Sequence, residues 1–163
     1  MRSDARAWKN ISTMSPIKLV SNYDVPLPVI QTAIEAVSTN TTIIFGWLDQ
    51  GPRKQYEYRV YLHFADFQNS QLRQFSASFN TLKSQEGSPP YLAPFVLSNN
   101  GWYKSENGAY NITLNATAAS KLPPMINAVE IYSRISHVNP KTFPRDCKHS
   151  LSHFFFYSIP CLV

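Results

Sequence analysis

Residues 55–68, QYEYRVYLHFADFQ, alternate apolar and polar side chains more cleanly than any other stretch of the 163-residue chain. One face of an extended strand would carry Tyr56, Tyr58, Val60, Leu62 and Phe64, and the other Glu57, Arg59, Tyr61 and His63. This period of two predicts a central β-strand with one buried face. At about 3.3 Å per residue such a strand is long for its kind, so we expect it to bend or end near Asp66.

Two further stretches show strand patterns. Residues 41–48, TTIIFGWL, are β-branched and aromatic almost throughout, which is typical of a strand covered on two sides. The turn signal Asp49-Gln-Gly-Pro follows it and predicts a hairpin with the central strand. Residues 72–80 alternate again and predict a second, half-buried hairpin after the short turn at 69–71.

The first part of the chain is less regular. Residues 17–20, IKLV, predict a short strand. Residues 25–30 contain two prolines, so we expect them to be extended at a sheet edge rather than helical. Residues 31–38, QTAIEAVS, fit a short helix and a strand end equally well.

The second half contains loops and two more strands. Residues 81–94 and 99–108 predict loops, and long loops on β scaffolds are where binding sites gather. Residues 110–115 alternate and predict a strand with Asn111 and Asn115 on its polar face. Residues 125–135 predict a final strand.

Composition supports an all-β domain. Aromatic residues make up 13% of the chain, and twelve prolines stand against five glycines. Because proline stops both helices and central strands, this balance favours many short strands joined by irregular loops. The length allows one domain with a substantial core.

The net charge of +5 does not indicate a nucleic-acid-binding protein. Residues 1–133 carry eleven Lys or Arg against nine Asp or Glu, whereas residues 134–163 carry four against one. No basic run or basic helix is present that could follow a phosphate backbone. We therefore expect no nucleic-acid partner.

Sequons and the first residues bear on the cellular compartment. Four N-x-S/T sequons, at Asn10, Asn40, Asn111 and Asn115, are candidate glycosylation sites and favour a secreted chain. The opening MRSDARAWKN holds no apolar signal-peptide segment, and no window approaches the ~20 apolar residues of a membrane span. A piece of a longer secreted chain would reconcile these observations.

The character of the sequence changes beyond Val138. We expect one domain over residues 1–138 and a foreign, disordered tail over residues 139–163. The tail holds a set of zinc-type ligands, Cys147, His149, His153 and Cys161. Because the tail is so unlike the domain, we predict no metal site and no cofactor. A disulfide between the two cysteines fits a secreted chain better.

A set of short motifs occurs in the order and spacing of one known family. They are residues 24–26 (DVP), 29–33 (VIQTA), Phe45 with Trp47, 55–56 (QY), 61–66 (YLHFAD), 72–75 (LRQF), 90–92 (PYL) and 122–132 (LPPMINAVEIY). In these motifs residues 8–135 resemble the malectin-like domains of plant receptor-like kinases, particularly the second lobe in the leucine-rich-repeat kinases. Asp66 departs from the Glu usual in the family, and Lys121 from the common Thr.

The resemblance implies a jelly-roll-like antiparallel β-sandwich on the extracellular side of the plasma membrane. The parent receptor would carry a first lobe, leucine-rich repeats and a Ser/Thr kinase domain outside this chain. The implied function is non-catalytic recognition of a carbohydrate or a secreted peptide through the loops of the sandwich. The alternative is an interaction lobe that packs on a second malectin-like lobe or a co-receptor and binds no sugar.

Exposed aromatic side chains are the candidate ligand-binding residues, because sugar C–H faces stack on aromatic rings. Trp102 and Tyr103 lie in the 99–108 loop, Tyr91 lies in the 81–94 loop, and Trp47 ends the strand at 41–48.

We predict no catalytic residue. His63 and Asp66 are three apart in a strand and therefore point to opposite faces, so His63 is expected to be structural rather than half of an acid–base pair. A glycan-processing enzyme on the same fold would need paired carboxyl groups, and the sequence shows no such motif.

Overall fold

The computed structural model describes residues 7–18, 25–49, 56–134 and 156–157. Its elements, in chain order, are β1 (Trp8–Ser12), α1 (Leu27–Ile30), β2 (Thr32–Ala36), β3 (Ile43–Leu48), β4 (Tyr58–Phe64), β5 (Phe75–Phe79), β6 (Gln85–Gly87), β7 (Phe95–Ser98), β8 (Ala109–Ala116), β9 (Met125–Ile126), β10 (Ala128–Ser133) and β11 (Phe156–Tyr157).

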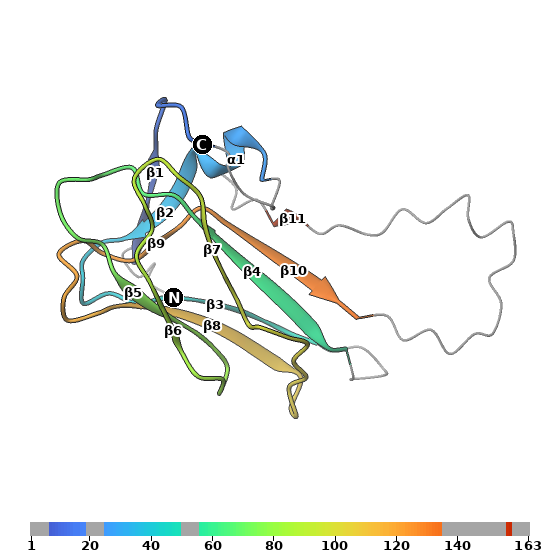
Figure 1. The fold of residues 1–163 in the computed structure, drawn as a ribbon. Coiled ribbons are helices and arrows are strands. Elements are labelled where there is room, and N and C mark those ends of the chain that lie inside the picture. Colours follow the sequence, from blue (N-terminus) through green and yellow to red (C-terminus); the bar gives the residue numbers. More distant parts are fainter. Residues whose placement is uncertain (1–6, 19–24, 50–55, 135–155, 158–163) are drawn as a thin grey trace, which may run out of the picture.

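The strands form three sheets, and all of their pairings are antiparallel. We call them the β4 sheet (β11-β10-β4-β7), the β8 sheet (β3-β8-β5-β6) and the β2 sheet (β1-β2-β9). Figure 1 shows β4 and β10 in one layer and β3 and β8 in the layer below. The antiparallel β-sandwich expected from the sequence is confirmed.

The main core lies between the β4 sheet and the β8 sheet, and the β2 sheet contributes at one end. Its buried residues are Ile34, Ala36, Ile43, Val60, Leu62, Phe64, Phe75, Ala77, Phe79, Tyr110, Ile112, Leu114, Ile126 and Val129. Val60, Leu62 and Phe64 are buried with the predicted period of two, whereas Tyr58 is half-buried and Tyr56 precedes the strand and is exposed. A smaller cluster beside α1 contains Ile17, Val25, Ile30, Ala65 and Ala128.

The two predicted hairpins are wrong. The strand β3 pairs with β8 rather than with β4, and β5 pairs with β8 and β6. The central strand β4 pairs with β10 and β7 instead. Alternation identifies the buried face of each strand, but strands that follow one another here enter opposite layers of the sandwich.

Two local predictions near the N-terminus also differ from the structure. Residues 27–30 form one helical turn, because Pro28 lies in the first turn, where its missing N–H would have no helical partner. The undecided segment after it is the strand β2. The described N-terminal strand is β1, and Ile17 is outside any strand and buried in the cluster beside α1, whereas residues 19 and 20 of the predicted strand lie outside the described residues.

The predicted final strand is divided at Asn127, between β9 and β10. The buried Asn127 side chain accepts a hydrogen bond from the Ala65 N–H at 2.8 Å. Its Nδ2 donates to the carbonyls of Ile30 and Thr32 at 2.8 and 3.1 Å. Because β9 pairs with β2 and β10 pairs with β4, this side chain stands where the chain passes from one sheet to another.

A second buried polar group is Arg73, whose side chain is only 1% exposed. Its Nε donates to Asp66 at 2.8 Å, and its Nη2 lies 2.8 Å from Glu35 on β2. Arg73 also donates to the Pro123 carbonyl, and Lys9 of β1 lies 2.8 Å from Glu35. One guanidinium therefore compensates two buried carboxylates from different parts of the sandwich.

Replacement of Asn127 by Ala should lower the free energy of unfolding by about 3 kcal/mol or more. The change leaves one buried N–H and two carbonyls without their partner, at about 1–3 kcal/mol each when nothing replaces it. The control is Asn99→Ala, because Asn99 also bridges two backbone groups, Val60 N–H and the Tyr58 carbonyl, but is only half-buried. Urea unfolding of both variants tests the prediction, and equal losses would contradict it.

Replacement of Arg73 by Met should lower the free energy of unfolding by about 3–5 kcal/mol, since Asp66 would lose its cation in a buried position and Glu35 would keep only the exposed Lys9. The matched control is Arg134→Met. Arg134 lies 2.9 Å from Glu57, but its side chain is 58% exposed, and exposed pairs contribute about 0–1 kcal/mol. Comparable shifts of the two urea midpoints would show that the Arg73 cluster is not a buried ion network.

Candidate functional site

The four candidate aromatic residues do not form one site. Trp47 stacks on Tyr110 with ring centroids 5.0 Å apart, and Tyr103 packs edge-on against Phe79 at 5.2 Å. Both rings therefore belong to the aromatic part of the core. In the same cluster, burial and the charge of Asp49 raise the pKa of Tyr58 to about 12.

The other two candidates are exposed but lie far apart. Tyr91 is 47% exposed and forms a β-bridge with Asp66, just beyond the end of β4. Trp102 is 42% exposed and precedes Tyr103, which forms a β-bridge with Tyr58 at the start of β4. The length of β4, about 20 Å at 3.3 Å per residue, separates the two regions.

From the bridge of its neighbour Tyr103, we infer that Trp102 lies on the outer face of the β4 sheet. Neighbouring residues of an extended segment point to opposite sides, so Trp102 points away from the core that Tyr103 enters. The antiparallel bridge between Tyr103 and Tyr58 aligns Trp102 with Arg59, whose side chain is also on the outer face. On this inference, the 99–108 loop and the outer face of the β4 sheet form one continuous surface.

We call this surface the aromatic platform, and it consists of Arg59, Tyr61, Trp102, Glu130 and Tyr132. On adjacent strands, Tyr132 lies opposite Arg59 and Glu130 lies opposite Tyr61. The Arg59 guanidinium carbon is 5.2 Å from the centre of the Tyr61 ring. The rings of Tyr61 and Tyr132 meet edge-on with centroids 5.8 Å apart.

Glu130 is the carboxylate of the platform. Tyr132 donates its hydroxyl to Glu130 Oε2 at 3.1 Å, and His63 Nε2 lies 3.4 Å from the same oxygen. Burial lowers the pKa of His63 more than Glu130 raises it, so the imidazole is neutral at pH 7. Burial and the neighbouring Glu130 raise the pKa of Tyr132, which remains a hydrogen-bond donor. The platform thus combines ring faces, hydroxyls, a cation and an acceptor.

Part of this surface could be recognised from the alternation in the sequence. Arg59 and Tyr61 were assigned to the polar face of the central strand, where the structure places them. Glu130 and Tyr132 had no such signal, because the register of β10 on β4 brings them beside Tyr61. His63 and Asp66 have separate partners, since Asp66 binds Arg73 and His63 lies beside Glu130.

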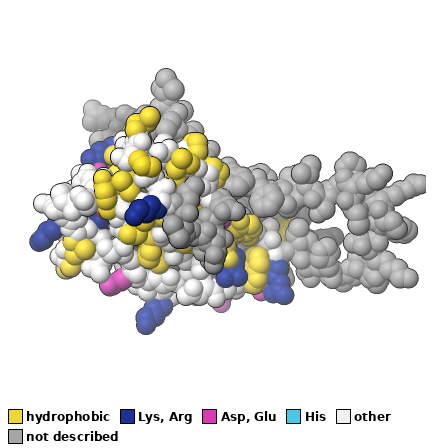
Figure 2. Space-filling model, turned by 45° about the horizontal axis from the view of Figure 1, so that its top comes forward, with side chains coloured by type: hydrophobic (Ala, Val, Ile, Leu, Met, Phe, Trp, Pro, Cys, Tyr) yellow, Lys and Arg dark blue, Asp and Glu magenta, His cyan; other side chains and the backbone are white. Residues whose placement is uncertain are grey.

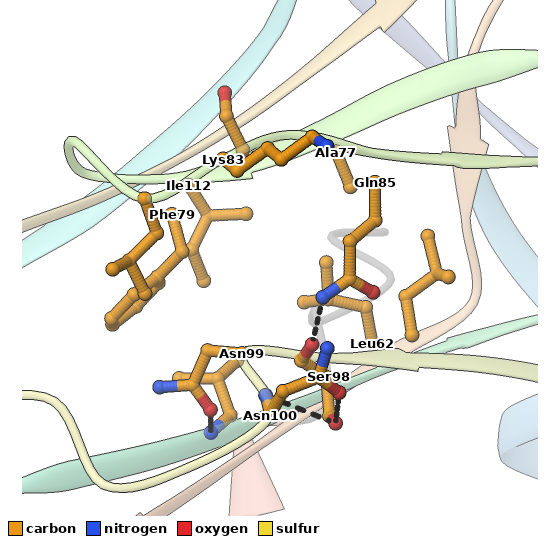
Figure 3. A pocket seen from close by; sticks show the side chains of 13 residues that line it. Leu62, Ala77, Phe79, Lys83, Gln85, Ser98, Asn99, Asn100 and Ile112 are labelled. Atoms are coloured by element: carbon orange, nitrogen blue, oxygen red, sulfur yellow. Dashed lines mark hydrogen bonds between the residues drawn. The ribbon is translucent and has the colours of Figure 1, made fainter.

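A cavity of about 210 Å³ lies between the two main sheets (Figure 3). Its lining includes Leu62, Phe79, Leu97 and Ile112 and, on the polar side, Lys83, Gln85, Ser98, Asn99 and Asn100. Figure 3 shows the Gln85 amide donating to the Ser98 carbonyl, at 2.7 Å, and so joining the two sheets. None of the described residues that line the cavity is an Asp or a Glu.

The side chains of the sequon asparagines Asn10, Asn40, Asn111 and Asn115 are all exposed. Asn111 and Asn115 lie on the outward side of β8, as the alternation predicted. The cysteines and histidines of the proposed zinc set, and the disulfide between Cys147 and Cys161, lie outside the described residues. So does the tail apart from β11, and the boundary at residue 138 stays a prediction.

Charged side chains are dispersed over one face of the molecule. Figure 2 shows Lys and Arg side chains spread over the visible face, between apolar and uncharged ones. Such scattering differs from the continuous basic stripe of a nucleic-acid-binding surface. Among the described residues, no helix is long and apolar enough to cross a bilayer.

Comparison with known proteins connects this architecture to plant receptors. Residues 1–134 match the family model of the malectin-like domain. A probable LRR receptor-like serine/threonine-protein kinase from Arabidopsis thaliana is 32% identical over 85% of this chain and 16% of its own length. A receptor-like protein kinase from the same plant is 31% identical over 88% of the chain and 16% of its own length. The chain thus spans about a sixth of these relatives.

Solved structures show the same fold at low sequence identity. The plant receptor-like kinase ANX2 superposes with a TM-score of 0.59 at 13% identity, over 79% of this chain and 39% of that one. A β-glucuronidase of Bacteroides uniformis gives a TM-score of 0.53 at 17% identity, over 82% of this chain and 15% of the enzyme. With the family match over most of its length, the chain belongs to the malectin-like domain family of plant receptor-like kinases.

Proposed function

We propose that this chain is a non-catalytic, extracellular recognition module of a plant receptor-like kinase, and that it binds carbohydrate on the aromatic platform. The observation that supports the proposal is that exposed Tyr132 and the Glu130 carboxylate share one face of β10, with exposed Trp102 next to the residue that bridges to the start of β4. Aromatic rings stack on the C–H faces of sugars, and a carboxylate accepts hydrogen bonds from their hydroxyls.

The rigidity of the platform supports this proposal. Four of its five residues lie on the paired strands β4 and β10. The contacts among Arg59, Tyr61, Tyr132 and Glu130 limit the rotamers of these side chains before any ligand arrives. A preorganised surface of this kind loses little conformational entropy on binding.

The arrangement of the acidic side chains near the platform favours recognition of a sugar over its hydrolysis. Glycoside hydrolysis generally uses two carboxyl groups that flank the scissile bond. Glu130 is hydrogen-bonded to Tyr132, and Glu57, which immediately precedes β4, is paired with Arg134. Neither is arranged as a free acid beside a second carboxylate.

A peptide ligand is the second candidate, and the cavity between the sheets favours it. The apolar side chains of Leu62, Leu97 and Ile112 could receive an apolar side chain, and Lys83 lies beside them. The described lining residues include no carboxylate that could accept hydrogen bonds from sugar hydroxyls. The two candidates therefore use different surfaces and can be separated by mutation.

The test is a glycan array probed with the full 163-residue chain, secreted from plant cells, followed by titration of each glycan that binds. Trp102→Ala and Tyr132→Ala should each weaken binding by about 30-fold, corresponding to the 2 kcal/mol or more of a buried aromatic contact. The matched control is Tyr91→Ala, since Tyr91 is similarly exposed but lies beyond the other end of β4.

Folding of each protein is verified by its thermal unfolding midpoint. A folded wild-type chain that binds no glycan would overturn the carbohydrate proposal and leave a peptide or a partner lobe as the ligand. An equal loss in the Tyr91 variant would show that binding occurs away from the platform.

A further inference from the structure

The outer face of the β8 sheet, on the opposite side of the sandwich from the platform, carries two sequon asparagines. Exposed residues alternate with buried ones along β8, so Asn111 and Asn115 both point outward. At about 3.4 Å per residue, their Cα atoms are about 14 Å apart. Each belongs to a complete sequon, which ends in Thr113 or Thr117.

The neighbouring strand β3 combines an open edge with exposed apolar side chains. In the described residues β3 pairs with β8 alone and forms one edge of its sheet. Ile44 and Leu48 on its outward side are 61% and 62% exposed. An apolar edge strand with unpaired backbone groups can pair with another chain, and proteins normally cover or charge such an edge.

The register places Ile44 between the two asparagines. Ile44 lies directly opposite Thr113, which is midway between Asn111 and Asn115 on β8. Both asparagines are therefore diagonal neighbours of Ile44 on the same sheet face, within reach of a long substituent.

Both carboxamides lie beside β3 and have their oxygen atoms toward it. Thr42 donates its hydroxyl to Asn115 Oδ1 at 2.6 Å. Gly46 lies opposite Asn111, and a Cβ atom at Gly46 would be only 2.5 Å from Asn111 Oδ1. Neither Nδ2 atom makes a hydrogen bond within the described residues. These amide nitrogens are the atoms to which an N-linked glycan is attached.

We propose that Asn111 and Asn115 carry N-linked glycans that lie over β3 and shield Ile44 and Leu48. In the transfer, Nδ2 forms a bond to C1 of an oligosaccharide carried on a lipid diphosphate. The C1–O bond to the diphosphate breaks, the diphosphate leaves, and the amide loses one proton. This inference rests on the proposed function only in requiring that the chain is secreted. It does not depend on which ligand the domain binds.

The first experiment determines whether the sites are occupied. The full chain is secreted from plant cells, and its intact and peptide masses are measured. Thr113→Ala should remove the glycan of Asn111 without changing that asparagine, whereas Thr113→Ser should retain it. Asn115→Gln should remove the second glycan. Unmodified Asn111 and Asn115 in the secreted chain would overturn the proposal, and glycans at Asn10 or Asn40 would show that the secretory route itself was used.

The second experiment tests the shielding by light scattering coupled to gel filtration and by binding of an apolar dye. The variant lacking both glycans, Thr113→Ala with Asn115→Gln, should self-associate and bind several-fold more dye than the wild-type chain. Further replacement of Ile44 and Leu48 by Thr should restore the monomer. The control Ser12→Ala removes the Asn10 sequon on the β2 sheet and should leave the chain monomeric.

Enzymatic removal of the glycans from the folded wild-type chain provides the same comparison without mutation, so a variant that fails to fold does not prevent the test. A deglycosylated chain that stays monomeric with unchanged dye binding would refute the shielding. Self-association that persists after Ile44 and Leu48 are replaced would refute it as well.

Discussion

The fold depends on the carboxamide of Asn127. This side chain joins the backbone after β4 to the backbone around α1 and β2, at the point where one continuous segment passes from the β2 sheet into the β4 sheet. The Asn127 N–H also donates to the His63 carbonyl and so begins the register of β10 on β4. That register places Glu130 and Tyr132 beside Tyr61 and Arg59, so a buried amide sets the geometry of an exposed surface.

Much of the fold could be predicted from local patterns, because alternation records which side of a strand meets the core. Val60, Leu62 and Phe64 are buried as expected. Strand partners could not be predicted, since alternation carries no information on which layer a strand joins. The buried Arg73 also escaped prediction, because its partners Asp66 and Glu35 come together only in the closed sandwich.

For the candidate site, the sequence predicted the exposure of aromatic side chains correctly only for residues in loops. Trp102 and Tyr91 are exposed as their loops suggested, but Trp47 and Tyr103 complete the aromatic core. From sequence alone, an aromatic residue at the end of a strand can be either a core residue or a ligand-binding residue. Only the packing in the folded domain distinguishes the two. Glu130 and Tyr132 acquire their neighbours from cross-strand pairing, which no single segment encodes.

The pairing of β3 with β8 has a consequence for how the chain acquires its structure. Thr42, next to β3, bonds Asn115 of β8 across 73 positions of sequence. Contacts of such separation require a large loop to close before any pairing is gained, and β-sandwiches of this kind fold in milliseconds to seconds. During synthesis β3 emerges long before β8 and stays without its neighbour until the later strand is available. The rate of folding is therefore governed by the order of the strands along the chain rather than by the preference of any strand for its own conformation.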